Sequence, residues 1–485
     1  MSIRESDYVV IGAGSSGCAL AHRLSLDPSI RVLVLEAGVS GEADPSVIIP
    51  GRWVSLMGSR YDWNYATEPE PGLEQRRIAF PRGKAHGGSS AINAMAYIRG
   101  SRACFDRWLA LGNPGWGFDD LLPLFARAER VLAVSDCLDP HAGHAAFLAA
   151  ALELGFRADA RHDFNGPQPD GVAGFYQKNI LSGRRQSTAA AFLAPALARS
   201  NVEMCSPAQA TRLVLEGRRV VGVEYRHEGR LQHVRAAREV VVCAGAVDSP
   251  RLLMLSGIGA ADDLRSRGIR VVADLRGVGG GLQDHPKLSI RWKGRTTLPA
   301  STVTAGLFTT SSSASLPDLQ FYIGRGVEQP DAFITITVAL VQPRSRGAIG
   351  LRSADPFAAP VIRANYLTEP RDVEALVEGA VLARRLGESR AYAHLRADEI
   401  EPGVSTQDLA QFAREKADTI YHPVGTCRMG PAADRDAVVD GDLRVHGIDG
   451  LRIADASIMP AMVNAPTHAA CVMIGEKCAA IISGR

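Results

Sequence analysis

The arrangement of apolar and polar positions over the first forty residues predicts a strand, a helix and a second strand. Residues 8–11 form an apolar run typical of a buried strand, and residues 18–26 carry apolar side chains at helical spacing. A second apolar run, residues 32–35, ends on Glu36. The pattern therefore predicts a β-α-β unit with an acidic residue at the end of its second strand.

The rest of the chain shows a coarser pattern of helical and strand-like segments. Helices are predicted within 104–160 and at 371–386, and strands at 202–223 (two strands joined by a turn at Gly217 and Arg218), 239–243 and 333–341. Residues 299–316 are rich in Ser, Thr and Ala and lack a strong period. This stretch is therefore interpreted either as a surface loop or as a lid over a pocket.

The turn after the first strand contains three glycines in the spacing Gly12-x-Gly14-x-x-Gly17. Gly12 permits a tight turn, Gly14 lets the backbone approach a pyrophosphate, and Gly17 lets the helix pack closely on the strand. The helix N-terminus offers free N–H groups to phosphates. The Glu36 carboxylate can accept the hydroxyls of an adenosine ribose and would repel a 2′-phosphate. The unit predicts dinucleotide binding and leaves NAD and FAD both open.

A second stretch, residues 81–95, combines basic residues with small ones. Arg82, Lys84 and His86 precede a run of glycines and serines, and Asn93 follows it. An exposed backbone of this kind suits close approach to a phosphate or to a flat ring, so we expect it to bind a ligand. Aromatic residues upstream are interpreted as packing inside a loop rather than as ligand contacts: Trp53, Tyr61, Trp63 and Tyr65.

Length, composition and charge narrow the class of protein. A chain of 485 residues exceeds the usual size of one compact core, so two domains are expected. The apolar fraction of 46% and the charged fraction of 22% are typical of a globular protein. A net charge of +2 gives no reason to expect binding of nucleic acid or of an anionic membrane.

The cysteine spacing and the first residues of the chain bear on the cellular compartment in which we expect the protein. The eight cysteines include no CxxC pair, so neither a zinc site nor a disulfide framework is indicated. The chain enters its first strand without an apolar signal segment and has no apolar run of about 20 residues. These features predict a cytoplasmic protein without a membrane span, present as a monomer or a small homo-oligomer.

Five motifs in one order make the chain similar to a known family. The stretch RGKAHGGSSAINAM at 82–95 follows the N-terminal unit, and further matches lie at 245–259, 281–286, 421–430 and 450–460. Together they resemble the glucose-methanol-choline family of FAD-dependent oxidoreductases. The resemblance implies an α/β, Rossmann-like FAD-binding domain of three layers (ββα) and an α+β substrate domain with an antiparallel sheet.

The resemblance also implies domain boundaries. The FAD-binding domain would comprise 1–155, 200–285 and 420–485, and the substrate-binding domain 156–199 and 286–419. The middle region is compact for this family, as expected from a trimmed lid or a lost oligomer contact.

Two histidines near the C-terminus are the candidate catalytic residues. In the family, a histidine and either a histidine or an asparagine face the reactive edge of the flavin, and the resemblance places His422 and His468 there. Asn464 is the alternative for the second position, and His285 is interpreted as part of the cofactor fold. A histidine base stabilises the alkoxide that develops as hydride leaves an alcohol. No metal is expected, because neither catalytic candidate has metal-site spacing or cysteine neighbours.

The resemblance further implies which residues hold FAD. Some relatives bind FAD covalently through a histidine just before the position of Asn93. This chain has Ile92 there, so we expect dissociable FAD. The predicted cofactor residues are Gly12, Gly14, Ser15, Ser16, Gly17, Glu36, Ala37, Arg82, Gly83, Gly88, Ser89, Asn93, Ala94, Met95, Ala96, Ala210, Asp455 and Ala456.

The resulting hypothesis is an FAD-dependent enzyme that oxidises an alcohol to an aldehyde or ketone. His422 would be the main base, His468 would position the hydroxyl, and oxygen or another acceptor would take the electrons. A small primary or aromatic alcohol is favoured. Oxidase and dehydrogenase both stay open. The alternatives are a hydroxynitrile lyase or other non-redox enzyme on the same fold, a non-catalytic flavin-binding protein and an NAD dehydrogenase.

Overall fold

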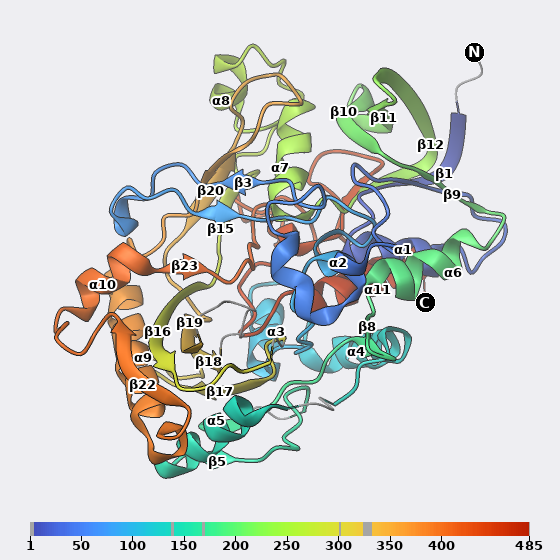
Figure 1. Ribbon diagram of the computed structural model, residues 1–485. Helices are drawn as coiled ribbons and strands as arrows, with labels where there is room; N and C mark the ends of the chain where they lie inside the picture. Colours follow the sequence, from blue (N-terminus) through green and yellow to red (C-terminus); the bar gives the residue numbers. More distant parts are fainter. Residues whose placement is uncertain (1–3, 137–139, 167–169, 300–301, 324–331, 485) are drawn as a thin grey trace.

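Two large β-sheets, at opposite sides of the molecule, organise the structure (Figure 1). The computed structural model describes residues 4–136, 140–166, 170–299, 302–323 and 332–484. Cys137 lies outside the described residues, and no two of the other seven cysteines form a disulfide with each other.

The first sheet has seven strands and contains the predicted N-terminal unit. Its central strands are parallel, and β10, β11 and β12 form an antiparallel meander at one side. The strand order is β10-β11-β12-β1-β2-β9, with β24 paired in parallel to β12. The bounds are β1 Arg4–Ile11, β2 Val32–Leu35, β9 Val202–Cys205, β10 Ala208–Glu216, β11 Arg219–His227, β12 Arg230–Val242 and β24 Leu451–Ile453.

Helix α1 (Ser15–Leu24) connects β1 to β2 and packs against the C-terminal helix α11 (His468–Ser483). A Cβ on Gly17 would lie 2.0 Å from the carbonyl oxygen of Gly12. A Cβ on Gly475 would lie 2.3 Å from the carbonyl oxygen of Ser16. Both glycines therefore permit close packing, which places segments from the two ends of the chain side by side (Figure 1).

The second sheet has eight strands and is antiparallel except for the pair β5–β6. Its order is β22-β16-β19-β18-β17-β6-β5, with β23 paired to β16. The bounds are β5 Arg157–Ala158, β6 Val172–Phe175, β16 Pro286–Gly294, β17 Ala305–Thr309, β18 Leu319–Ile323, β19 Phe333–Leu340, β22 Arg396–Glu401 and β23 Asp418–Thr419.

Helix α9 (Pro370–Glu388) covers one face of this sheet. Every second residue of β16 is buried toward the helix, and a Cβ on Gly387 would lie 2.2 Å from the ring of Trp292. Likewise, a Cβ on Gly379 would lie 2.6 Å from the side chain of Val338. The opposite face of the same strands is thereby left to face the interior of the molecule.

The remaining elements surround these sheets. The other helices are α2 Pro45–Ile48, α3 Arg102–Ala110, α4 Phe118–Leu132, α5 Ala142–Glu153, α6 Ala194–Leu197, α7 Gly245–Leu255, α8 Ala261–Ser266 and α10 Leu409–Lys416. Short strands pair as β3 Tyr65–Ala66 with β4 Ala79–Phe80, β7 Ile180–Leu181 with β8 Arg184–Arg185, β13 Ile258–Gly259 with β14 Ala273–Asp274, and β20 Gly347–Gly350 with both β15 Gly280–Leu282 and β21 Val361–Arg363.

Several predicted segments agree with the structure and two need correction. The helices within 104–160, the helix at 371–386 and the strand at 333–341 are confirmed. Residues 202–223 hold three strands rather than two, because β9 joins β2 in parallel before the β10–β11 hairpin begins. Residues 305–309 of the predicted loop or lid form the buried strand β17. Residues 300 and 301 lie outside the described residues.

Every strand of the seven-stranded sheet falls within the residues predicted for the FAD-binding domain. Every strand of the eight-stranded sheet falls within those predicted for the substrate-binding domain. The domain boundaries themselves stay a prediction.

Candidate active site

A cavity of about 630 Å³ reaches from the C-terminal ends of β1 and β2 to the inner face of β16, β18 and β19. We call it the central cavity. All of the predicted cofactor residues except Gly17 line it, as do both predicted catalytic histidines. Gly17 instead packs against Gly12. The space where its Cβ would lie is taken up by the carbonyl group of Gly12.

The glycine turn leaves open space for a ligand beside its backbone. A Cβ on Gly14 would meet only the carbonyl oxygen of Cys243, at 3.9 Å, and Gly245 has no atom within 4 Å of its Cβ position. Gly88 approaches the same turn so closely that its Cβ would lie 2.8 Å from the Cα of Gly14. These three glycines form a backbone-lined cradle of the kind that accommodates a pyrophosphate.

Two buried carboxylates lie at the walls of this cradle. Glu36 accepts hydrogen bonds from the backbone N–H groups of Ala13 (2.8 Å) and Gly38 (2.7 Å). Burial raises the pKa of Glu36 to about 7, partly offset by these two hydrogen bonds. Asp455 accepts from the backbone N–H of Gly245 at 2.8 Å and from the hydroxyl of Ser249 at 2.5 Å. Both carboxylates are thus fixed in place by the protein.

The loop at residues 81–96 is held from behind by a buried arginine. Arg185 donates to the carbonyl oxygen of Asn93 (2.6 Å), to the side-chain oxygen of Asn93 (2.8 Å) and to the carbonyl of Val47 (2.8 Å). Its burial lowers its pKa to about 9. The hydroxyl of Ser89 accepts from the backbone N–H of Gly83 at 3.1 Å. These contacts set the shape of the loop that lines the cavity. No motif of the sequence pointed to Arg185.

His422 is oriented through its backbone and its ring. Its backbone N–H donates to the buried carboxylate of Asp284 at 2.7 Å. Its ring Nδ1 lies 3.0 Å from Nδ1 of His285, and Nε2 of His285 lies 3.1 Å from the carbonyl oxygen of Val463. Because a carbonyl only accepts, Nε2 of His285 carries its proton and its Nδ1 is bare. His422 therefore donates through Nδ1, and its Nε2 keeps a free lone pair.

Both rings of this pair are neutral near neutral pH. Burial lowers the pKa of His285 to about 3. Burial, followed by the neighbouring His285 and Arg82, holds the pKa of His422 well below its usual range. His285, which we interpreted only as part of the cofactor fold, thus contacts the candidate base directly. No spacing in the sequence could show this, because 137 residues separate the two histidines.

His468, the first residue of α11, lies at the opposite wall of the cavity from the substrate-domain sheet. Its Nδ1 is 3.0 Å from the hydroxyl of Ser15, and its buried Nε2 has no protein partner. Burial, then the charge of Arg185, lowers its pKa to about 4. Asn464, in contrast, lines a separate cavity, where its side-chain oxygen accepts from the backbone N–H of Ser101 at 2.9 Å.

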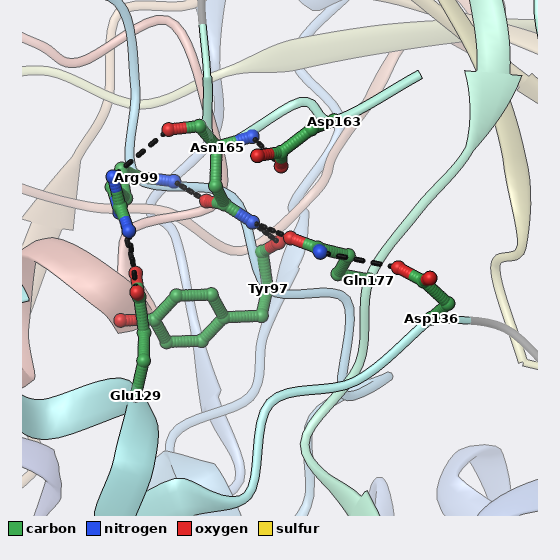
Figure 2. Close-up of polar contacts among 7 residues, drawn as sticks. All are labelled: Tyr97, Arg99, Glu129, Asp136, Asp163, Asn165 and Gln177. Carbon is green, nitrogen blue, oxygen red and sulfur yellow. Dashed lines mark hydrogen bonds and ion pairs between the residues drawn. The ribbon is translucent and has the colours of Figure 1, made fainter. Parts of the chain in front are cut away.

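A polar network fixes the aromatic ring behind His468 (Figure 2). The ring of Tyr97 meets that of His468 edge-on, with centroids 6.2 Å apart. The side chain of Asn165 donates to the backbone carbonyl of Tyr97 at 3.1 Å and accepts from the backbone N–H of Arg99 at 2.8 Å. Arg99 forms a bidentate ion pair with Glu129 of α4. The network joins this wall of the cavity to α4.

The inner face of the eight-stranded sheet supplies polar lining that the sequence analysis missed. Every second residue on three strands faces the cavity, namely Lys287, Ser289 and Arg291 on β16, Gln320 and Tyr322 on β18, and Phe333, Thr335 and Thr337 on β19. The alternation with Leu288, Ile290 and Trp292 was a usable signal. Trp53 and Trp63, which we expected to pack within a loop, also line the cavity.

Comparison with known proteins decides the family. Models of the GMC oxidoreductase family match residues 6–287 and 343–475. The chain belongs to the GMC oxidoreductase family. The predicted fold class is thereby confirmed, and so is FAD as the cofactor, which the cradle and its two carboxylates fit. The chain is an oxidoreductase. Membership of this family contradicts the alternative of an NAD dehydrogenase.

Relatives in the family cover nearly the whole chain. Mitochondrial choline dehydrogenase of Mus musculus is 38% identical over 99% of this chain and 90% of its own length. Oxygen-dependent choline dehydrogenase of Sinorhizobium fredii is 38% identical, with coverages of 99% and 96%. Among solved structures, pyridoxine 4-oxidase from Mesorbium loti is 31% identical, covers 99% of both chains and has a TM-score of 0.91. A formate oxidase is 25% identical, covers 100% of this chain and 99% of its own, and has a TM-score of 0.90.

Two searches of the described residues gave no match. None of the helices in the described ranges is long and apolar enough to cross a membrane. Within the same part of the chain, no group of three or more His, Cys, Asp or Glu side chains could hold a metal ion. The cytoplasmic location and the oligomeric state stay predictions.

Proposed function

We propose that the protein oxidises a primary or secondary alcohol to an aldehyde or ketone, with His422 as the base that takes the hydroxyl proton. The observation that carries this proposal is the chain of donors from His422 Nδ1 through His285 to the carbonyl of Val463. It leaves a neutral imidazole with a free Nε2 lone pair at the wall of the cavity. A base in this state stabilises the developing alkoxide.

His468 is proposed to orient the substrate hydroxyl. Its Nε2 is buried without a protein partner, and a buried polar atom of this kind gains most from a ligand that completes its hydrogen bonding. Its pKa of about 4 keeps the ring neutral. Asn464 does not reach the central cavity, so its geometry favours His468 for this role.

The predicted cofactor residues that line the central cavity are proposed to bind FAD. Gly17 is proposed to shape the turn by packing against Gly12. When bound, FAD supplies the acceptor for the hydride that leaves the alcohol carbon. The cradle of Gly14, Gly88 and Gly245 would hold the pyrophosphate, and Glu36 the adenosine ribose. FAD is proposed to be non-covalent, because Ile92 offers no nucleophile and the ring of His86 is bound to the Ser206 hydroxyl at 2.7 Å.

The relatives support an alcohol as the substrate. Two of them are named for choline and pyridoxine, both of which carry hydroxyl groups. The cavity of about 630 Å³ must hold the flavin as well, so we propose a small primary or aromatic alcohol. Oxygen or another electron acceptor would reoxidise the flavin.

Anaerobic bleaching of the flavin by a panel of alcohols tests this proposal. The wild-type holoenzyme should lose its yellow colour with at least one alcohol, and His422→Ala should slow this reduction by roughly 10²–10⁴-fold, the usual contribution of a general base. His446→Ala is the matched control, since His446 binds the carbonyl of Gly430 and does not line the cavity.

Two outcomes would overturn the proposal. If no alcohol bleaches the flavin while the enzyme cleaves a cyanohydrin, the chemistry is that of a hydroxynitrile lyase. If the flavin is inert toward all of these compounds, the protein only binds FAD.

A further inference from the structure

The substrate half of the central cavity carries positive charge on one strand. Lys287, Ser289 and Arg291 alternate along β16 with buried apolar residues, so all three point into the cavity. The Nζ of Lys287 lies 5.4 Å from the ring centre of Tyr421, the residue that precedes His422. Arg291 lies over the ring of Phe333 at 4.6 Å. Two cations thus face the space where a substrate would lie.

The carboxylates that pair with these cations lie outside the cavity lining. Lys287 forms an ion pair with Asp418 of β23 at 3.3 Å, and Arg291 with Glu401 of β22 at 3.4 Å. Glu401 also pairs with Lys416 at 3.5 Å. Each carboxylate stands directly opposite its cation in the strand register and therefore on the same face of the sheet. Among the described residues, however, the cations line the cavity and their carboxylates do not.

Acids on the cavity wall belong to the nucleotide-binding half. Among the described lining residues they are Glu36, Asp248 and Asp455. Glu36 and Asp455 accept backbone N–H groups, as described above, and Asp248 pairs with Arg251 at 2.7 Å. No described acid lines the half that faces β16, β18 and β19. A cationic substrate would therefore meet cations and neutral groups, but no acid, among the described lining residues of that half.

A third cation reinforces this field beside the candidate base. Arg82 lines the cavity, is half-buried, and donates to the backbone carbonyls of Pro81 and Tyr421. Lys287 is the second residue of β16 and follows His285, which directly precedes the strand, by two positions, a separation of about 7 Å at 3.4 Å per residue. An anionic group a few bonds from a hydroxyl held at His422 would thus come within reach of Lys287.

We infer that the alcohol oxidised here carries an anionic group, and that Lys287 binds it. The inference rests on the proposed function and names the substrate class of the same site. The fitting class is a short hydroxyalkyl carboxylate, phosphonate or phosphate. It differs from the quaternary ammonium alcohol after which the choline dehydrogenase relatives are named, because like charges in a poorly solvated site repel.

A matched series of alcohols HO–CH₂–CH₂–X tests the inference in the holoenzyme. The compounds are choline, 3,3-dimethylbutan-1-ol, 3-hydroxypropanoate and 2-hydroxyethylphosphonate, and the readout is kcat/KM for anaerobic flavin reduction. An anionic member should exceed the neutral one by at least about tenfold, and choline should be the poorest substrate. The two anions distinguish carboxylate from phosphonate recognition.

Variants assign the effect to one side chain. Lys287→Met should abolish the preference for the anion, because the KM of the anionic alcohol should rise more than the KM of the neutral one. Lys293→Met is the matched control, because Lys293 lies on the same strand but does not line the cavity. If the neutral alcohol or choline is preferred and Lys287→Met changes nothing, the inference is wrong.

A binding measurement separates this inference from the proposed function. Propanoate cannot be oxidised at a hydroxyl, so its effect on the visible flavin spectrum of the oxidised holoenzyme reports binding alone. We expect propanoate to bind in wild type and at least about tenfold more weakly in Lys287→Met. That result without flavin reduction by any alcohol would refute the proposed function and leave the anion site standing. Equal binding in both proteins would refute the anion site.

Discussion

At the scale of single residues, the candidate base is defined by a second histidine. Most histidines can carry their proton on either ring nitrogen, and the partner of one nitrogen decides the state of the other. Here the carbonyl of Val463 fixes His285, and His285 fixes His422. The direction of proton donation follows from a carbonyl oxygen, which accepts a hydrogen bond and cannot donate one. His285 is a positioning residue, since it acts through His422.

The pH dependence of flavin reduction follows from this arrangement. A base works in its neutral form, so the rate falls only as pH drops through the pKa of His422, which burial, His285 and Arg82 hold well below 6.5. The reduction rate should therefore stay constant from pH 8 to below 6.5. An inflection at or above pH 6.5 would contradict the assignment.

The substitution His285→Phe tests the contact between His285 and His422 in a second way. Without an acceptor for its Nδ1 proton, His422 loses its fixed tautomer and one cause of its lowered pKa. The reduction rate should fall by about 10- to 100-fold, less than in His422→Ala, and its acidic inflection should move toward 6.5. A slower rate with an unmoved inflection would indicate a purely structural role for His285.

At the scale of elements, two glycines in the turn between β1 and α1 have different roles. Gly14 faces the cavity, whereas Gly17 faces the backbone of Gly12. Only the structure distinguishes them, because the sequence pattern assigns both to the same motif. The predicted strands and helices were mostly correct since their apolar periods are local. β9 was merged with β10 because its pairing with β2 depends on a partner 170 residues away.

Paired alanine variants test this distinction. Gly14→Ala has an allowed backbone conformation (φ −82°, ψ −164°), so the apoprotein should keep its stability while its affinity for FAD falls at least about tenfold. Gly17→Ala would place a methyl group 2.0 Å from the Gly12 carbonyl oxygen, and should lower the free energy of unfolding by about 1–3 kcal/mol or more. Urea unfolding and FAD titration measure the two effects. Loss of stability in Gly14→Ala alone would reverse the two roles.

At the scale of the whole molecule, segments from distant parts of the chain build one cavity, which strands of both large sheets line. The cofactor residues that the motifs predicted line this cavity, except Gly17, because glycine spacing marks the backbone positions of the turns. Their contact with FAD stays a prediction. The substrate half was missed. Lys287 and Arg291 become lining residues only through the pairing of β16 with β19 and the packing of α9 on the other face.

Release of FAD from the denatured protein tests whether the cofactor is held without a covalent bond. Acid precipitation of the holoenzyme should leave the flavin in the supernatant, because neither Ile92 nor His86 is placed to form a covalent bond. The melting temperature should rise with added FAD, since a ligand that binds only the folded state stabilises it. Flavin that stays with the precipitated protein would show covalent attachment.

The most direct test of the central claim is the rate of anaerobic flavin reduction in His422→Ala with and without added imidazole. The substrate is whichever alcohol reduces the wild-type flavin fastest. We expect the substitution to slow reduction by at least about 10²-fold and imidazole to restore part of the rate, because it replaces the missing base. A rate in His422→Ala equal to that of the wild type would contradict the account.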